Sequence, residues 1–196
     1  MRLFHHSILF IFLATAVFSC KKRGCTDTEA LNYDQTAKKD DHGCYYFWIG
    51  QKYGGGRVFY IDQTKKHGLI SAEIKIPNTA WGCTGSSIVG AQSTFVGTGL
   101  QNTSSIVANC NDISAAFRCS ELDTLGFNDW YLPSKEELKG LYESLGKIGQ
   151  GELSSDYYWS SSENDSSSAW TIMFANGAAA ILPKSVGYSI CAIRSF

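Results

Sequence analysis

Several stretches of the chain carry the apolar pattern of β-strands. Gly54–Asp62 joins a glycine run to an apolar, β-branched and aromatic segment, and His67–Ala72 repeats that character after a short polar turn. Further along, Trp170–Ala175 alternates apolar and polar positions and leads through Asn176-Gly177 into the run Ala178–Leu182. Asn-Gly is the preferred two-residue turn of a β-hairpin, so the sequence predicts one hairpin early in the chain and another near its end.

The middle of the chain has apolar residues at helical spacing instead. Asp112 is a candidate N-cap for a first helix that ends before Gly126. Ser134 opens a second helix with a capping box to Glu137, and Gly146 ends it. The apolar faces of the two helices consist of Ile113, Ala116, Phe117, Leu138, Leu141, Tyr142 and Leu145. We expect both faces to pack into the core.

A last strand, Tyr188–Ser195, follows the second hairpin. Strands at both ends of residues 47–196, with two helices between them, predict an α+β domain whose terminal strands lie side by side.

Residues 1–19 read as a targeting segment and not as part of the fold. Arg2 precedes an apolar core, Ile8–Ala14, and this stretch is shorter than the roughly 20 residues that span a bilayer. Val17–Cys20 resembles the lipobox of bacterial lipoproteins, in which the cysteine becomes the acylated N-terminus. We therefore expect Cys20 to carry fatty-acyl chains such as palmitate and to anchor the protein in the cell envelope, at the outer membrane. A plain secretory signal with a cysteine nearby by chance is the alternative.

An exported protein can form disulfides, so this assignment bears on the remaining cysteines. Apart from Cys20, six of the seven cysteines lie in the mature chain, and an exported compartment permits disulfides. We expect Cys25 to pair with Cys44 and Cys110 with Cys119, because each pair closes a short loop; Cys83 and Cys191 then remain for each other. Sequence alone leaves other connectivities open.

Charge excludes one class of partner. Without Arg2, the chain has 16 basic and 18 acidic residues, a net charge of −2. No strong positive field is available for nucleic acid, so we expect no nucleic-acid partner. With 13% aromatic residues, 19 glycines and 3 prolines, the composition is typical of a compact, turn-rich globule.

Residues 20–46 form a short appendage before the main domain. The stretch is rich in acids and amides and is bounded by two cysteines, as in small modules that cannot build a core. It resembles the short cysteine-bounded repeats found beside the anchors of secreted Bacteroidetes proteins. Its carboxylates could supply hard oxygen ligands to calcium: Asp27, Asp34, Asp40 and Asp41. The alternative is a solvated acidic surface, and no EF-hand pattern is present.

A series of motifs runs in order through the main domain. They are GGRVFYID at 55–62, HGLI at 67–70, WGC at 81–83, GTG at 97–99 with Asn102-Thr103, NDWYLPSKEEL at 128–138, YWSSSE at 158–163, Ala169-Trp170 and AIRSF at 192–196. This set resembles the C-terminal domain family of the Legionella collagen-like adhesin, and the Fibrobacter major paralogous domains have similar motifs. The resemblance implies a C-type-lectin-like α+β fold, surface exposure, a homotrimer in some cases and, for the named adhesin, binding of sulfated glycans.

Two departures change the expected ligand. Cys191 stands where the family usually has an arginine. Residues 47–196 also contain 11 basic and 13 acidic side chains, a balance that disfavours a heparin-type ligand. A neutral glycan or an extracellular protein is therefore the better expectation.

Two polar segments are candidate ligand contacts. Sugar binding needs planar hydrogen-bonding groups and an aromatic platform. The residues of these types are Asn128, Asp129, Trp130, Glu163, Asn164 and Asp165. The polar run from Glu163 to Ser168 has the character of an exposed loop. Tryptophans this frequent, such as Trp130 and Trp159, more often fill a core. The Glu-Pro-Asn tripeptide of calcium-dependent lectins is absent, so that metal mechanism does not carry over.

Three function classes remain. We expect a non-catalytic binding domain with no cofactor other than calcium, because the sequence lacks a Gly-x-Ser-x-Gly elbow and a His-Glu-x-x-His helix. A sulfatase-modifying-type enzyme on a related fold is the first alternative, since Cys83 or Cys191 could act as a reactive thiol. A purely structural surface protein is the second.

Overall fold

The computed structural model describes residues 21–151 and 153–196, so the predicted signal and Cys20 lie outside the described residues. The helices are α1 (Gly99–Asn109), α2 (Ala115–Ser120), α3 (Lys135–Ser144) and the short 3-10 helix η1 (Gly146–Ile148). The strands are β1 (Arg23–Gly24), β2 (Lys39–Asp40), β3 (Lys52–Tyr53), β4 (Gly56–Ile61), β5 (Gly68–Ala72), β6 (Ile76–Ala80), β7 (Tyr157–Glu163), β8 (Ser168–Met173), β9 (Ala179–Pro183), β10 (Gly187–Ile190) and β11 (Ile193–Ser195). This arrangement confirms the α+β class.

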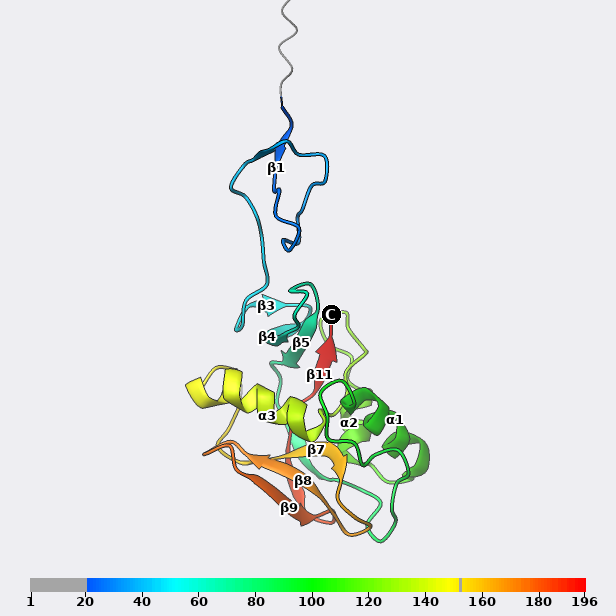
Figure 1. Cartoon of the computed structure of the whole chain (residues 1–196). Coiled ribbons are helices and arrows are strands. Elements are labelled where there is room, and N and C mark those ends of the chain that lie inside the picture. The colour runs from blue at the N-terminus through cyan, green and yellow to red at the C-terminus, as the bar shows by residue number, and fades with distance from the viewer. Residues whose placement is uncertain (1–20, 152) are drawn as a thin grey trace, which may run out of the picture.

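The main domain is built on two sheets (Figure 1). One has four strands in the order β11-β5-β4-β3, and the other has five in the order β6-β10-β7-β8-β9. Helix α3 lies between them and contacts β4 on one side and β7 and β8 on the other. Helices α1 and α2 pack together at one side of the domain.

Both predicted hairpins are present. β4 and β5 pair antiparallel, and so do β8 and β9. The turn between β8 and β9 contains Asn176 and Gly177, with Gly177 at φ +74°. A Cβ at Gly177 would lie 2.1 Å from Cε1 of Tyr142, so both the backbone conformation and the packing require glycine there.

Helix α3 begins as its sequence predicts. The Ser134 hydroxyl accepts a hydrogen bond from the Glu137 N–H, and the Glu137 carboxylate accepts one from the Ser134 N–H at 2.7 Å. Leu138, Leu141 and Leu145 are fully buried. The capping box therefore fixes the start of the helix, and its apolar face packs into the core.

The last strand is split. β10 belongs to the five-stranded sheet, whereas β11 pairs with β5 in the four-stranded sheet. The chain passes between the sheets at Cys191 and Ala192, and Ala192 O accepts a hydrogen bond from Ala72 N at 2.9 Å. As a result β11 lies in the same sheet as β3 and β4, the first strands of the domain.

The sequence did not predict every element, and one predicted cap is misplaced. Helix α1, the short helix η1 and the strands β1, β2, β3, β6 and β7 were not expected. The first predicted helix starts later than expected, because Ser114 and not Asp112 caps α2 by accepting from Phe117 N at 3.1 Å. The Asp112 carboxylate instead accepts from Cys83 N at 3.3 Å.

The structure confirms one predicted disulfide and corrects the other two. Cys25 is bonded to Cys44, but Cys83 is bonded to Cys110. The pairs Cys110–Cys119 and Cys83–Cys191 are therefore wrong. The short loop from Cys110 to Cys119 was a misleading criterion, because α2 turns Cys119 into the core while the end of α1 brings Cys110 beside Cys83. Cys119 and Cys191 are free and buried.

Candidate functional site

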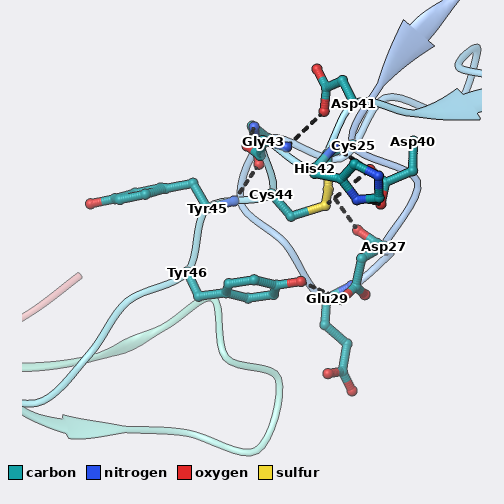
Figure 2. Close-up of a disulfide and its surroundings, with 11 residues drawn as sticks. Cys25, Asp27, Glu29, Asp40, Asp41, His42, Gly43, Cys44, Tyr45 and Tyr46 are labelled. Carbon is teal, nitrogen blue, oxygen red and sulfur yellow. Dashed lines mark hydrogen bonds and ion pairs between the residues drawn. A yellow bond between two sulfur atoms is a disulfide. The ribbon is translucent and has the colours of Figure 1, made fainter.

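The four aspartates proposed for calcium do not gather around one point. In the part of the appendage that Figure 2 shows, the Asp40 and Asp41 carboxylates accept from the backbone N–H groups of His42 and Gly43. Asp27 accepts from the Tyr46 hydroxyl. Asp40 and Asp41 are thus used in local turns, as is usual for this residue type, whereas Asp27 joins the start of the appendage to its end.

Asp34 is also engaged locally, with Thr36 and with Lys22 Nζ at 2.7 Å. Within residues 21–151 and 153–196, no group of three or more Asp, Glu, His or Cys side chains is placed to hold a metal ion. The geometry therefore gives no support to a calcium site in the appendage.

The predicted contact residues Asn128, Asp129 and Trp130 are not grouped as a ligand platform. Trp130 is buried, and its Nε1 donates to Phe127 O at 3.0 Å. Asp129 accepts from the Arg194 guanidinium at 2.6 and 2.8 Å, and this contact lowers the pKa of its carboxyl. Asn128 alone is exposed with its side chain unengaged by the described residues. Of the three residues, Asp129 is the one whose side chain joins this segment to β11, through Arg194.

Glu163 does not stand in an exposed loop. It ends β7, is 2% exposed, and pairs with the fully buried Lys184 at 2.5 Å. Its carboxylate also accepts from the Ile88 N–H at 2.9 Å and the Ser87 hydroxyl at 2.8 Å. Burial acts to raise the pKa of Glu163, but Lys184 and these donors hold it below its ordinary value. The carboxylate fixes a loop to the five-stranded sheet and is closed to an outside ligand.

Asn164 and Asp165 do lie in an exposed turn. The Asp165 carboxylate accepts from the N–H groups of Ser167 and Ser168 at 2.8 and 2.9 Å, and the Ser167 contacts lower its pKa to about 2. Asn164 donates to Ser168 Oγ at 3.0 Å. This turn is accessible, but much of its hydrogen-bonding capacity is used within itself.

A pocket of about 430 Å³ lies elsewhere, where the two sheets part. Two of its walls are the segments that cross between the sheets, 72–76 and 190–191. The third wall is the segment that leads from η1 into β7 and contributes Leu153, Ser154 and Asp156. The volume falls in the range of small-molecule sites.

Polar side chains meet in this pocket. Ser189 Oγ lies 3.3 Å from Asn78 Oδ1 and 3.5 Å from Asp156 Oδ2. The Ser154 hydroxyl donates to Asp156 Oδ2 at 2.7 Å and lies 3.1 Å from the Tyr158 hydroxyl. Burial raises the pKa of Tyr158, so its hydroxyl stays protonated. The five side chains provide hydrogen-bond donors and acceptors side by side.

An irregularity of the sheet explains how Asn78 reaches Ser189. Between the pairs Tyr188↔Thr79 and Ile190↔Ile76 the register shifts, so that Pro77 and Asn78 of β6 oppose Ser189 alone. β6 is an edge strand, where a proline without an N–H is tolerated. Such bulges change the direction of side chains and occur beside binding sites.

The remaining walls are apolar or cationic. Ile74, Ile76, Leu153 and Ile190 line the pocket with aliphatic surface, and Lys75 is exposed at it. Cys191 also lines it, 4% exposed and 3.1 Å from Ser71 Oγ. Burial raises the pKa of Cys191 to about 11, so the thiolate is scarce at neutral pH. Chemically, the pocket is equipped to form hydrogen bonds rather than to attack a substrate.

Sequence reasoning named Cys191 for another role and missed every polar contact residue of this site. Its polar residues come from β6, from the segment before β7, from β7 itself and from β10, and no two of Asn78, Asp156 and Ser189 are close in sequence. Only Pro77 in an otherwise strand-like run could have indicated an edge strand with a bulge.

No helix in the described part of the chain is both long and apolar enough to cross a bilayer. The lipid attachment predicted at Cys20 lies outside the described residues.

Comparison with known proteins adds a family and a fold neighbour. The family model described as "Lcl C-terminal domain" matches residues 76–194, which include most of the pocket. A crystal structure of a fimbrial protein from Bacteroides ovatus is similar with a TM-score of 0.54 and 13% identity, over 79% of this chain and 51% of that chain. The chain thus spans about half the length of that protein, and at this identity the likeness concerns the fold alone.

The comparison with curated proteins found no match. The family match covers well over half of the chain and all but the first strands of the main domain. Together with the ordered motifs between residues 81 and 194, it shows that the chain belongs to the Lcl C-terminal domain family.

Proposed function

We propose that the protein is an exported lipoprotein, anchored through Cys20, that displays a non-catalytic binding domain for an extracellular glycan or protein. The observation that carries this proposal is the family match over residues 76–194 combined with a hydrogen-bonding pocket inside the matched region. The appendage then acts as a spacer that holds the domain away from the lipid anchor.

Charge favours an uncharged ligand. The main domain contains more acidic than basic residues, and Asp156 stands at the pocket itself. A sulfated or otherwise anionic chain would meet this carboxylate, and Lys75 is the one cationic side chain among the described residues that line the pocket. We therefore favour a neutral glycan, with a protein surface as the second choice.

The enzymatic alternative has little support in the site. His42 and His67 are both exposed, and neither of them lines the pocket. Cys119 and Cys191 are buried, and burial raises the pKa of both thiols. A sulfatase-modifying type of chemistry would need a reactive, accessible thiol. Thiol titration separates the cases: we expect no rapid reaction in the native protein and two thiols after unfolding, whereas a fast native thiol would favour the enzyme.

The finer fold assignment is also a proposal. A C-type-lectin-like fold is supported by β11 joining β5 in the sheet that holds β3 and β4, which brings the two ends of the domain together. A homotrimer remains a further proposal from the family, and light scattering of the exported protein would measure its mass.

The test of the function is a binding screen. The chain carrying Cys20→Ser, which removes the lipid site, is exported, labelled and applied to arrays of neutral glycans, sulfated glycans and extracellular matrix proteins. We expect retention on a subset of the neutral glycans. Retention on matrix proteins alone would move the proposal to a protein ligand, and binding to none of the three arrays would leave the purely structural alternative.

The anchor is tested separately by mass analysis of the wild-type protein from bacterial membranes. We expect a mature N-terminus at Cys20 with acyl chains attached. A polypeptide that retains residues 1–19 without modification would contradict the anchored part of the proposal.

A further inference from the structure

We propose that the pocket between the two sheets, lined by Asn78, Asp156 and Ser189, binds a single uncharged sugar residue of the ligand. This inference rests on the proposed function and specifies the place and the chemical class of the contact.

The polar groups match a pair of neighbouring sugar hydroxyls. Asp156 is an obligate acceptor when ionised, and Asn78 offers both an acceptor and two donors. In the described residues, no protein acceptor bonds Asn78 Nδ2 and no protein donor bonds Asp156 Oδ1. A vicinal diol can donate to the carboxylate and accept from the amide at the same time, so it satisfies both groups.

The hydrogen bonds that the polar groups form with one another are long enough for a ligand hydroxyl to replace them. Ser189 Oγ is 3.3 Å from Asn78 and 3.5 Å from Asp156, which are long distances for hydroxyl hydrogen bonds. A sugar hydroxyl placed between these groups would form shorter bonds than the protein forms within itself. The Ser154 contact to Asp156 at 2.7 Å meanwhile holds the carboxylate in position.

The aliphatic walls suit the other face of a sugar ring. Ile74, Ile76 and Ile190 lie around the polar groups, and Leu153 covers them from the segment before β7. A pyranose presents C–H groups beside its hydroxyls, so a pocket that is half polar and half aliphatic matches both. Tyr158 is buried and contributes its hydroxyl, so these aliphatic side chains, and not an aromatic platform, would contact the apolar face of the ring.

The charges select against anionic sugars. Asp156 would repel a sulfate or carboxylate, and Lys75, the one cationic side chain among the described lining residues, leaves the pocket without a net positive charge. An uncharged sugar is therefore the better match. For one monosaccharide, limited contact area predicts a dissociation constant on the order of 1 mM, so strong attachment would need several domains acting together.

The test is an amide-shift titration of the exported, ¹⁵N-labelled chain carrying Cys20→Ser. The probes are glucose, galactose, mannose, fucose and N-acetylglucosamine, each raised to about 50 mM, which exceeds the expected dissociation constant many times. Glucuronate serves as the charged comparison. We expect at least one neutral sugar to shift amides of residues 72–78, 153–158 and 189–191, and glucuronate to shift none of them.

Variants make the assignment specific. Asn78→Ala and Asp156→Ala each remove a contact from an exposed side chain, and we expect each to weaken binding at least tenfold. Asn111→Ala, an exposed asparagine between α1 and α2 that belongs to no candidate contact segment, is the matched control and should bind as wild type. The unchanged remainder of the spectrum reports that each variant is folded.

The outcomes separate this inference from the proposed function. If no neutral sugar shifts the pocket amides, or if Asn78→Ala and Asp156→Ala bind like wild type, the pocket assignment fails. Array binding that persists in the Asn78→Ala/Asp156→Ala double variant would overturn the pocket while leaving the binding function intact. Absence of both array binding and amide shifts would overturn both.

Discussion

Two groups of polar residues differ in what they bind. Those that the sequence predicts as ligand contacts mainly bind other parts of the protein, whereas those that line the pocket keep groups available for a ligand. Glu163 forms a buried ion pair with Lys184, and Asp129 forms an ion pair with Arg194 of β11. Asn78 and Asp156 instead keep hydrogen-bonding groups that no described residue engages. A conspicuous polar motif can therefore be a structural device, while a binding site is assembled from inconspicuous residues of separate strands.

The largest expected effect on stability is at the buried ion pair of Lys184 and Glu163. Lys184→Met leaves the Glu163 carboxylate buried without its cation, and we expect a loss of about 3–5 kcal/mol in the free energy of unfolding. Urea denaturation measures it. Lys147→Met is the control, because Lys147 and Glu143 form an exposed pair at 3.9 Å whose loss should cost less than about 0.5 kcal/mol. If Lys184→Met were as stable as this control, Glu163 would not be a structural residue.

Acid should lower the free energy of unfolding through protonation of Glu163. The pKa of Glu163 is lowered in the folded state, so the unfolded chain takes up the proton first as pH falls. The stability from this carboxylate is present above its ordinary pKa of 4.5 and is lost as pH falls through the lower folded value. We expect a smaller loss than for Lys184→Met, because the protonated carboxyl can still accept a hydrogen bond from the Lys184 ammonium. Urea unfolding between pH 7 and pH 3 measures it.

The control for acid is the double variant Lys184→Met/Glu163→Gln, which carries no charge at either position. Its free energy of unfolding should fall less steeply below pH 4.5 than that of the wild type. Equal slopes would mean that other carboxylates, and not Glu163, account for the acid dependence.

Much of the fold could be predicted from the sequence. The capping box at Ser134, the Asn176-Gly177 turn and the Cys25–Cys44 bond all depend on residues close together in the chain. Local chemistry determines such features, so a single sequence contains the information.

What could not be predicted depends on packing. α1 buries Asn102 and Thr103 alongside Ile106, so it has no apolar stripe, and its N-cap residue makes no side-chain cap bond. β7 contains three consecutive buried serines, 160–162, which resemble a loop in composition. Both the Cys83–Cys110 bond and the pocket arise only when distant segments meet. The periodicity that reveals amphipathic elements is absent where a polar side chain is buried.

A moderate effect is expected at the other predicted contact segment. Asp129→Ala removes both hydrogen bonds to Arg194, whose guanidinium would remain over the Phe127 ring. Because Asp129 is half exposed, we expect a loss of about 1 kcal/mol in the free energy of unfolding, with sugar binding unchanged. Urea denaturation and the sugar titration together measure it. Unchanged stability with lost binding would return Asp129 to the ligand site.

The smallest effect on stability should occur at the pocket. Asn78→Ala and Asp156→Ala alter exposed side chains, so each should change the free energy of unfolding by no more than about 0.5 kcal/mol. The same denaturation experiment measures it. A loss comparable to that of Lys184→Met would show that these side chains support the fold, which would remove the contrast between the two regions.

The most direct measurement is the map of amide shifts when a neutral monosaccharide binds to the exported chain. The account predicts that the largest shifts lie in residues 72–78, 153–158 and 189–191, around the pocket. Shifts concentrated at 128–130 and 163–165, with the pocket amides unmoved, would contradict it and restore the interpretation that the sequence alone suggested.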